Sequence, residues 1–258
     1  MNRYAVSDLH GQLDLYNQIK EYINNDDVLY VLGDCNDRGP HPWATLRSAL
    51  DDGQCCLLMG NHEYMLLNAI EYALNNMPGG IDALRDEDFF WYNPSGHLDP
   101  ITLLEHNGGM TTLLQWAREQ KYLEYYEKIK HLPTVTILLS NKSQNCIYLS
   151  HAGYNPTDID SSIEEFVWNR HHYMYTSEDF NEGDIMVHGH TPVPYLVEEL
   201  QWRHKSYSLT NDGLGCCIYN NGFKYDIDLG AYHTGRTCLL NLDTLETKIF
   251  ETEVVDEY

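Results

Sequence analysis

Short apolar runs alternate with amphipathic stretches over the first third of the chain. "YAV", "VLYVL" and "CCLLM" are mostly apolar, and each is followed by a cluster of Gly, Asp, Asn or His. Between and after these runs, apolar residues recur at helical spacing over about 12–24, 41–51 and from 63 to about 75. Continuous apolar strands are typical of a parallel sheet that is covered on both faces. The pattern therefore predicts an α/β fold, in which ligands bind at the carboxyl ends of the strands.

The remainder of the chain divides into a helical part and a strand-rich part. Residues 77–131 have a mainly helical pattern with breaks at "MPGG", "NPSG" and "HNGGM", and we interpret them as an insertion or cap. From 133 onward strands dominate, and Asn-Asn-Gly at 220–222 is typical of a hairpin turn. No linker, repeat or low-complexity tract interrupts the sequence, so we expect residues 1–258 to form a single domain.

Charge and cysteine content narrow the possible functions. The 258-residue chain carries 16 basic and 39 acidic residues, a formal net charge of -23. Such a surface repels nucleic acid and anionic membranes, and we expect neither as a partner. No apolar run has the length of a membrane span, and no secretory signal is recognisable at the N-terminus. The seven cysteines form no C-x-x-C pair, which favours free thiols and a reducing, cytoplasmic location.

Side chains with metal-binding chemistry follow five of the predicted strands. The segments are "SDLHG", "GDCNDRG", "GNHE", "SHAG" and "HGHTP", which contain Asp8, His10, Asp34, Asp37, Arg38, Asn61, His62, Glu63, His151, His188 and His190. Alone, each segment is more typical of a turn, a helix cap or a solvated loop than of a metal site, and a single histidine such as His151 is more often a packing residue than a ligand. Because parallel strands end at one edge of a sheet, the five together favour a metal site.

The donor types indicate the kind of metal. Aspartate, histidine and asparagine without cysteine suit manganese, iron or zinc. A carboxylate shared by two ions would hold them about 3.5–4 Å apart, the spacing of two-metal hydrolases. An arginine beside such a centre suits phosphate oxygens. The residues therefore predict phosphate chemistry at a metal centre.

The ordered set of five motifs resembles the PPP-type metallophosphatases, which are calcineurin-like metallophosphoesterases. The resemblance is greatest to the small bacterial and bacteriophage serine/threonine protein phosphatases. "FVWNR" at 166–170 and "DIDLGAYHTGRTCLLNLDT" at 226–244 are also similar to segments of that family. The resemblance implies a β-sandwich of mixed sheets flanked by helices. Departures are Ser7 in place of the usual glycine, and Cys35 and Asn36 in a variable part of the second motif.

The resemblance also assigns roles to individual residues. It implies two divalent metal ions, with manganese favoured and iron or zinc as alternatives. Arg38 and Arg170 would clamp the phosphoryl oxygens, and His62 would be the general acid, oriented by Asp37. His188 is expected beside the ligands rather than among them. The implied ligands are Asp8, His10 and Asp34 for the first ion, and Asp34, Asn61, His151 and His190 for the second.

The activity implied by the resemblance is hydrolysis of phosphoserine and phosphothreonine in proteins or peptides. A hydroxide bridging the two ions would attack phosphorus directly, so no phosphoenzyme would form. Relatives with the same motifs hydrolyse dinucleoside polyphosphates symmetrically, and the metal centre does not distinguish the two activities. A catalytically silent phospho-ligand binder is disfavoured, because Asp34, His62 and both arginines are present. The sequence leaves the physiological substrate, the native metal and the oligomeric state open.

Overall fold

Two mixed β-sheets form the centre of the fold in the computed structural model, which describes residues 1–87, 89, 91, 98–141, 145–153, 162–170 and 180–253. The first sheet has the order β11 (Thr247–Glu251), β10 (Arg236–Asn241), β1 (Arg3–Val6), β2 (Val28–Val31) and β3 (Cys55–Leu57). The second has the order β4 (Val135–Leu139), β5 (Cys146–Ser150), β6 (Ile185–His188), β9 (Lys224–Asp226), β8 (Cys217–Tyr219) and β7 (Tyr207–Leu209). The predicted β-sandwich of mixed sheets is confirmed.

Each sheet has a parallel centre and antiparallel edges. Strands β1, β2 and β3 run parallel, as do β5, β6 and β9. The antiparallel strands β10 and β11 flank one parallel group, and β4, β7 and β8 flank the other. The carboxyl ends of each parallel group therefore meet at one edge of its sheet.

The strands are buried on both faces, but helices cover only one face of the first sheet. Tyr4 and Val6 belong to a core shared with the helices, whereas Ala5 between them packs into a second core with residues of the other sheet, such as Leu149 and Val187. The alternation follows from the period of two in a strand. The expected cover on both faces is therefore present, with helices on one face and the second sheet on the other.

Three helices follow the first three strands close to the predicted positions. They are α1 (Leu13–Tyr22), α2 (Pro42–Asp51) and α3 (Asn61–Asn75). Helix α1 buries Leu15, Tyr16 and Ile19, which lie on one face because they are separated by three and four residues. Proline at the first position of α2 costs no hydrogen bond there. The apolar periodicity of this region was thus a reliable guide.

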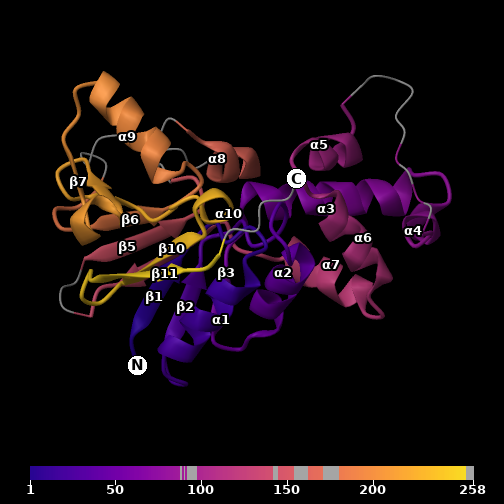
Figure 1. Ribbon diagram of the computed structural model, residues 1–258, viewed down its shortest axis with the longest axis horizontal. Coiled ribbons are helices and arrows are strands. Elements are labelled where there is room, and N and C mark those ends of the chain that lie inside the picture. Colours follow the sequence, from indigo (N-terminus) through magenta and orange to yellow (C-terminus); the bar gives the residue numbers. More distant parts are fainter. Residues whose placement is uncertain are drawn as a thin grey trace.

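The helical part of the chain continues through four further helices, which lie on one side of the two sheets together with α3 (Figure 1). They are α4 (Gly80–Leu84), α5 (Pro100–His106), α6 (Met110–Arg118) and α7 (Tyr122–Lys130). "MPGG" ends at the first residue of α4, and "HNGGM" runs from the last residue of α5 to the first residue of α6. "NPSG" lies outside the described residues. Leu104, Leu113 and Trp116 join these helices to the core beside α3.

The later part of the chain contains one confirmed hairpin and several elements that were not predicted. Strands β8 and β9 pair antiparallel, and Asn220, Asn221 and Gly222 have the positive φ angles that this turn requires. The pattern analysis missed β7 and the helices α8 (Ile163–Trp168), α9 (Val193–Trp202) and α10 (Ala231–Thr234). Among the described helices, none combines the length and apolar character needed to cross a membrane.

Candidate metal centre and active-site pocket

The loops that follow the strands hold the predicted residues in an unusual backbone conformation. Of the twelve non-glycine residues described with positive φ, six are predicted site residues, namely Asp8, His10, Asp34, Asp37, Arg38 and His190. Left-handed backbone is costly for residues with a Cβ and persists where the surrounding structure fixes it. The sharp turns aim successive side chains toward one place at the strand ends.

Asp34 lies between two groups of histidines. Its Oδ2 is 3.6 Å from Nε2 of His10, and its Oδ1 is 3.5 Å from Nε2 of His151. One carboxylate thus presents its two oxygens to two different imidazoles, which is the arrangement of a carboxylate shared by two ions. Burial, followed by the nearby charges of Asp8 and Glu63, raises the pKa of Asp34 well above its usual value. A cation bound beside these buried carboxyl groups would stabilise their ionised form.

The tautomers of two histidines suit metal binding. The carbonyl of Leu32 lies 2.7 Å from Nδ1 of His151, and the carbonyl of Asn36 lies 3.1 Å from Nδ1 of His10. Each carbonyl can accept only from a protonated Nδ1, which leaves the lone pair on Nε2, facing Asp34. Burial lowers the pKa of both imidazoles and keeps them in the neutral form that ligates metals.

The second donor group is made by three buried residues. The amide oxygen of Asn61 lies 2.9 Å from Nε2 of His151 and 2.9 Å from Nδ1 of His190. The two imidazole nitrogens are themselves 3.1 Å apart. His151, His190 and Asp34 form one cluster with metal-ligand geometry, and His10, His62 and Asp34 form another. Oxygen and nitrogen donors without sulfur fit borderline divalent ions, so these residues can hold such ions.

Asp8 is connected to the loop of His190 by a hydrogen bond. Its Oδ2 accepts hydrogen bonds from the hydroxyl of Ser7 and, at 3.0 Å, from the backbone N–H of His190. It lies outside both clusters, although it lines the same cavity. The role of Asp8 as a ligand of the first ion therefore stays a prediction, and His62 occupies its place in the geometric cluster.

His62 and Asp37 form a buried pair. Nδ1 of His62 lies 2.7 Å from Oδ2 of Asp37, and both side chains are almost fully buried. Burial and then Arg38 lower the pKa of His62, while burial raises the pKa of Asp37 to about 7 against hydrogen bonds from Thr112 and Asn36. The carboxylate fixes the imidazole so that Nε2 faces the cavity. Such a pair can hold and deliver a proton at Nε2.

Two arginines approach the donor clusters from different loops. Nη2 of Arg38 lies 2.8 Å from Nε2 of His62, and Nη1 lies 3.1 Å from Nε2 of His10. Arg170 follows α8 and donates to the hydroxyl of Thr191 at 3.1 Å. Both guanidinium groups line the cavity and can offer forked N–H donors to phosphate oxygens.

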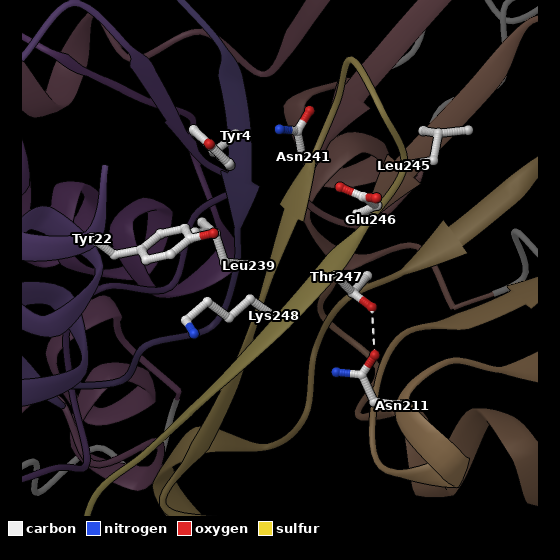
Figure 2. Close-up of a pocket in the computed structure, with 9 residues that line it drawn as sticks. All are labelled: Tyr4, Tyr22, Asn211, Leu239, Asn241, Leu245, Glu246, Thr247 and Lys248. Atoms are coloured by element: carbon white, nitrogen blue, oxygen red, sulfur yellow. Dashed lines mark hydrogen bonds between the residues drawn. The ribbon is translucent and has the colours of Figure 1, made fainter. Parts of the chain in front are cut away.

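A cavity of about 210 Å³ collects these groups. Eight of the ten predicted site residues line it, namely Asp8, His10, Asp34, Arg38, Asn61, His62, Arg170 and His190. The other two are directly behind it: Asp37 holds His62, and His151 contacts Asn61 and His190. A larger cavity of about 550 Å³ lies beside β10 and β11, and none of the predicted residues lines it (Figure 2).

His188 and Cys35 belong to neither of the two clusters with metal-ligand geometry. Nε2 of His188 lies 2.7 Å from the hydroxyl of Tyr219, so its expected place beside the ligands stays a prediction. Burial lowers the pKa of His188 to about 3. Cys35 is fully buried, and burial raises the pKa of its thiol, which makes it inert.

Glu63 is a structural part of the site that the sequence analysis noted without assigning a role. Its carboxylate accepts the backbone N–H groups of Asp34 at 2.8 Å, Cys35 at 2.7 Å and Gly60 at 3.0 Å. Burial raises its pKa to about 7, against these hydrogen bonds. Its position three residues after a glycine, at the start of a helix, was an available capping signal.

Several residues at or near the cavity were not predicted from the sequence. Asp228, Tyr232 and His233 lie in "DIDLGAYHTGR", which was noted only as a whole. Asp228 follows β9, which is parallel to β6, so its position at a strand end was a usable signal. Tyr195 from α9 and Thr112 from α6 carried no comparable signal, because they reach the site only through tertiary packing.

Two glycines allow the close approach of loops to the acidic donors. A Cβ on Gly60 would lie 2.3 Å from Oδ1 of Asp34, and a Cβ on Gly189 would lie 2.2 Å from Oδ2 of Asp8. Neither separation is possible between real atoms. The glycines in "GNHE" and "HGHTP" are therefore required by the positions of the carboxylates.

At the strand ends of the two mixed sheets, one carboxylate lies between two groups of histidines. This arrangement is typical of a dinuclear metal-dependent phosphoesterase. Comparison of sequences agrees with this class. Residues 1–194 match the family described as calcineurin-like phosphoesterase. The chain belongs to this family.

Similar proteins carry two kinds of names. The chain is 32% identical over 139 residues to a symmetrical bis(5'-nucleosyl)-tetraphosphatase of Acidovorax ebreus, covering 46% of this chain and 47% of that protein. It is 26% identical over 196 residues to the enzyme of the same name from Colwellia psychrerythraea, covering 73% of this chain and 60% of that protein. The matched region thus spans about half of the length of these relatives.

A solved structure carries the other name. A serine/threonine phosphatase of Saccharomyces cerevisiae, with similarity to the human phosphatase PP5, superimposes with a TM-score of 0.55. The alignment covers 100% of this chain and 81% of that chain, at 13% identity. This likeness supports the fold and leaves the substrate undecided.

Proposed function

We propose that this chain hydrolyses phosphate esters by direct attack of water, with the leaving group protonated by His62. The observation that carries the proposal is the pair of His62 and Asp37, 2.7 Å apart, directly beside the Asp34 clusters. Two divalent ions held by those clusters would supply a nucleophilic water of lowered pKa and positive charge for the phosphoryl oxygens. We propose manganese as the native ion, with iron and zinc as alternatives.

The residues of the chain have separate tasks in this proposal. Arg38 and Arg170 bind and orient the phosphoryl group from two sides of the cavity. His62 delivers a proton from Nε2 to the leaving oxygen, and Asp37 holds the opposite ring nitrogen so that the imidazole cannot turn away. Burial of Asp37 strengthens this hold, because little solvent competes for the carboxylate.

The first substrate class that we propose is phosphoserine and phosphothreonine in proteins or peptides. Of the fourteen residues that line the cavity, Arg38 and Arg170 are the cationic side chains other than histidine. The sequence adds no lysine or arginine in 154–161 or 171–179, which flank two of the motifs. Two arginines match one phosphoryl group. The net charge of -23 further favours peptides with basic residues near the phosphate.

A second substrate class, symmetrical dinucleoside polyphosphates, is supported by other observations. The two sequence relatives described above carry this name. In addition, Tyr195, Tyr232 and His233 line the cavity, and Tyr195 is 65% exposed. The rings of Tyr232 and His233 have centroids 4.7 Å apart. Exposed rings of this kind can stack on a nucleobase.

A substrate panel separates the two classes. Protein reconstituted with manganese, iron or zinc is assayed with a phosphoserine peptide, a phosphotyrosine peptide, p-nitrophenyl phosphate and diadenosine tetraphosphate at one ionic strength. We expect a higher kcat/KM for the phosphoserine peptide. If diadenosine tetraphosphate exceeds the best phosphopeptide by more than tenfold, the second class replaces the first. Tyr195→Ala then tests whether Tyr195 stacks on a nucleobase. If it does, the substitution raises KM for the dinucleotide and leaves KM for p-nitrophenyl phosphate unchanged.

We also propose a reducing, cytoplasmic setting for the protein. All seven cysteines are free thiols, and four of them are buried in the core. Buried thiols without disulfide partners are typical of a reducing compartment. Mass spectrometry of the purified protein with and without thiol alkylation tests this, since seven alkylated cysteines are expected after unfolding.

A further inference from the structure

Helix α6 is packed against the loop that carries Asp37, one member of the proton-delivering pair. The backbone N–H of Arg38 donates to the carbonyl of Gly108 at 3.3 Å, just before the helix. A Cβ on Gly109 would lie 2.7 Å from Oδ2 of Asp37, so the backbone of residue 109 lies directly on the carboxylate. The segment that begins α6 thus forms one wall of the pocket around Asp37, although about 70 residues of sequence separate them.

Thr112 makes two hydrogen bonds to Asp37. Its hydroxyl donates to Oδ1 of Asp37 at 2.5 Å, and Oγ1 of Thr112 in turn accepts the backbone N–H of Asp37 at 3.2 Å. Asn36 donates to Oδ1 as well, at 2.8 Å. Oδ2 remains for Nδ1 of His62, at 2.7 Å. Each oxygen of the carboxylate therefore has its own partners, and rotation of the group would break bonds on both sides.

The environment makes this contact strong and well defined. Thr112 and Asp37 are fully buried, and His62 is 1% exposed. In such surroundings a hydrogen bond to a carboxylate is stronger than in water, and a missing partner is not replaced by solvent. Asp37 also lies at the N-terminal turn of α6, a nine-residue helix whose dipole favours a negative charge there.

We propose that Thr112 is a positioning residue for proton delivery, and that the helical segment 77–131 therefore takes part in catalysis through α6. The inference rests on the proposed role of His62 as general acid. Thr112 touches neither substrate nor leaving group. It sets the orientation of Asp37, Asp37 sets the orientation of the His62 ring, and the ring places its Nε2 proton beside the leaving oxygen.

The test compares three substitutions at position 112. Thr112→Val removes the hydroxyl and keeps the side-chain volume nearly constant. Thr112→Ala removes the hydroxyl and also makes the side chain smaller, and Thr112→Ser keeps the hydroxyl. Each is assayed with a phosphoserine peptide, whose leaving alkoxide needs a proton, and with p-nitrophenyl phosphate, whose leaving group does not. We expect Thr112→Val and Thr112→Ala to lose about tenfold or more in kcat for the phosphopeptide and under threefold for p-nitrophenyl phosphate. Thr112→Ser should keep both rates within threefold.

Thr45 provides the matched control. It is equally buried, and its hydroxyl donates to the carbonyl of His41 at 2.8 Å in α2, away from the pair. Thr45→Val should change both substrates by the same small factor. Metal content and the melting temperature are measured for every variant. A purely structural role for Thr112 would reduce both activities in parallel, and that outcome overturns the proposal.

The comparison with His62→Asn separates this inference from the proposed function. If His62→Asn shows the leaving-group difference and the hydroxyl-free variants do not, the inference alone is wrong. If His62→Asn has wild-type kcat on the phosphopeptide, the proposed proton delivery is wrong and the inference falls with it. Should neither hydroxyl-free variant fold, Thr112→Ser decides, because selective loss of phosphopeptide activity in that folded variant contradicts the proposal.

Discussion

Oδ1 of Asp34 accepts the backbone N–H of His62 at 3.0 Å, so one carboxylate supports both the donor clusters and the proton donor. The same oxygen lies 3.5 Å from Nε2 of His151. A substitution of Asp34 is therefore expected to disturb both donor clusters and the first turn of α3, which contains His62. No other described site residue has contacts of this kind to His10, His62 and His151 together.

Asp34→Asn is expected to reduce metal occupancy. The substitution removes the negative charge and replaces one of the two oxygens by an N–H₂ group, which cannot ligate a cation. We expect the loss of about one bound ion or more per chain and at least a 10²-fold loss in kcat. Metal content is measured by mass spectrometry after dialysis. Full occupancy in Asp34→Asn would exclude the shared-carboxylate arrangement.

His62→Asn is expected to behave differently, because His62 is proposed to deliver a proton rather than to hold an ion. We expect kcat on a phosphoserine peptide to fall by roughly 10²–10⁴ while metal content stays at the wild-type level. The loss should be smaller with p-nitrophenyl phosphate. His62 also belongs to a cluster with ligand geometry, so loss of an ion in this variant would reassign it as a ligand.

Gly60→Ala should impair the metal site although it replaces no ligand residue. The added methyl group would lie 2.3 Å from Oδ1 of Asp34 and 2.8 Å from Oε2 of Glu63, both of which must then move. We expect metal affinity to fall by about tenfold or more, as for other changes that displace a ligand. Isothermal titration with manganese measures this. Gly53→Ala is the control, because a Cβ there has nothing within 4 Å; equal affinities in the two variants would refute the argument.

The local pattern predicted the first β-α units and the donors at their strand ends because both depend on short stretches of sequence. Helices α1, α2 and α3 followed from apolar periodicity, and the donors followed from residue type immediately after each strand. A buried strand does not reveal what buries it, so the β-sandwich arrangement followed from the family resemblance and not from the apolar pattern. The start of α9 was hidden by the prolines of "HTPVPY".

Long-range contacts account for what could not be predicted in the site. Thr112 and Asp37 are 75 residues apart, and nothing near Thr112 in the sequence indicates a catalytic neighbour. Tyr195 is an exposed aromatic residue on a helix, which on its own is unremarkable. The resemblance assigned roles to motif residues, whereas the supporting residues outside those motifs became visible only in three dimensions.

The buried amine of Lys224 gives the protein a pH-dependent stability away from the active site. Lys224 is fully buried in β9, and burial lowers its pKa to about 7. In the unfolded chain the pKa is about 10.4. Between these values the folded state loses its proton while the unfolded state keeps it, so the free energy of unfolding rises with pH. Below pH 7 both states are protonated, and the cost of burying the charge is constant and greatest.

Lys224→Met removes this dependence and keeps a long side chain in place. We expect the variant to be more stable than the wild type at pH 7, with the difference shrinking by about 1 kcal/mol per pH unit up to pH 9, because one bound proton is worth at most ~1.4 kcal/mol per unit. Urea unfolding at pH 7, 8 and 9 measures it. Lys205→Met, at an exposed position, should show no such trend. A constant difference between Lys224→Met and the wild type across this range would mean that Lys224 keeps its proton in the folded protein and would contradict the prediction.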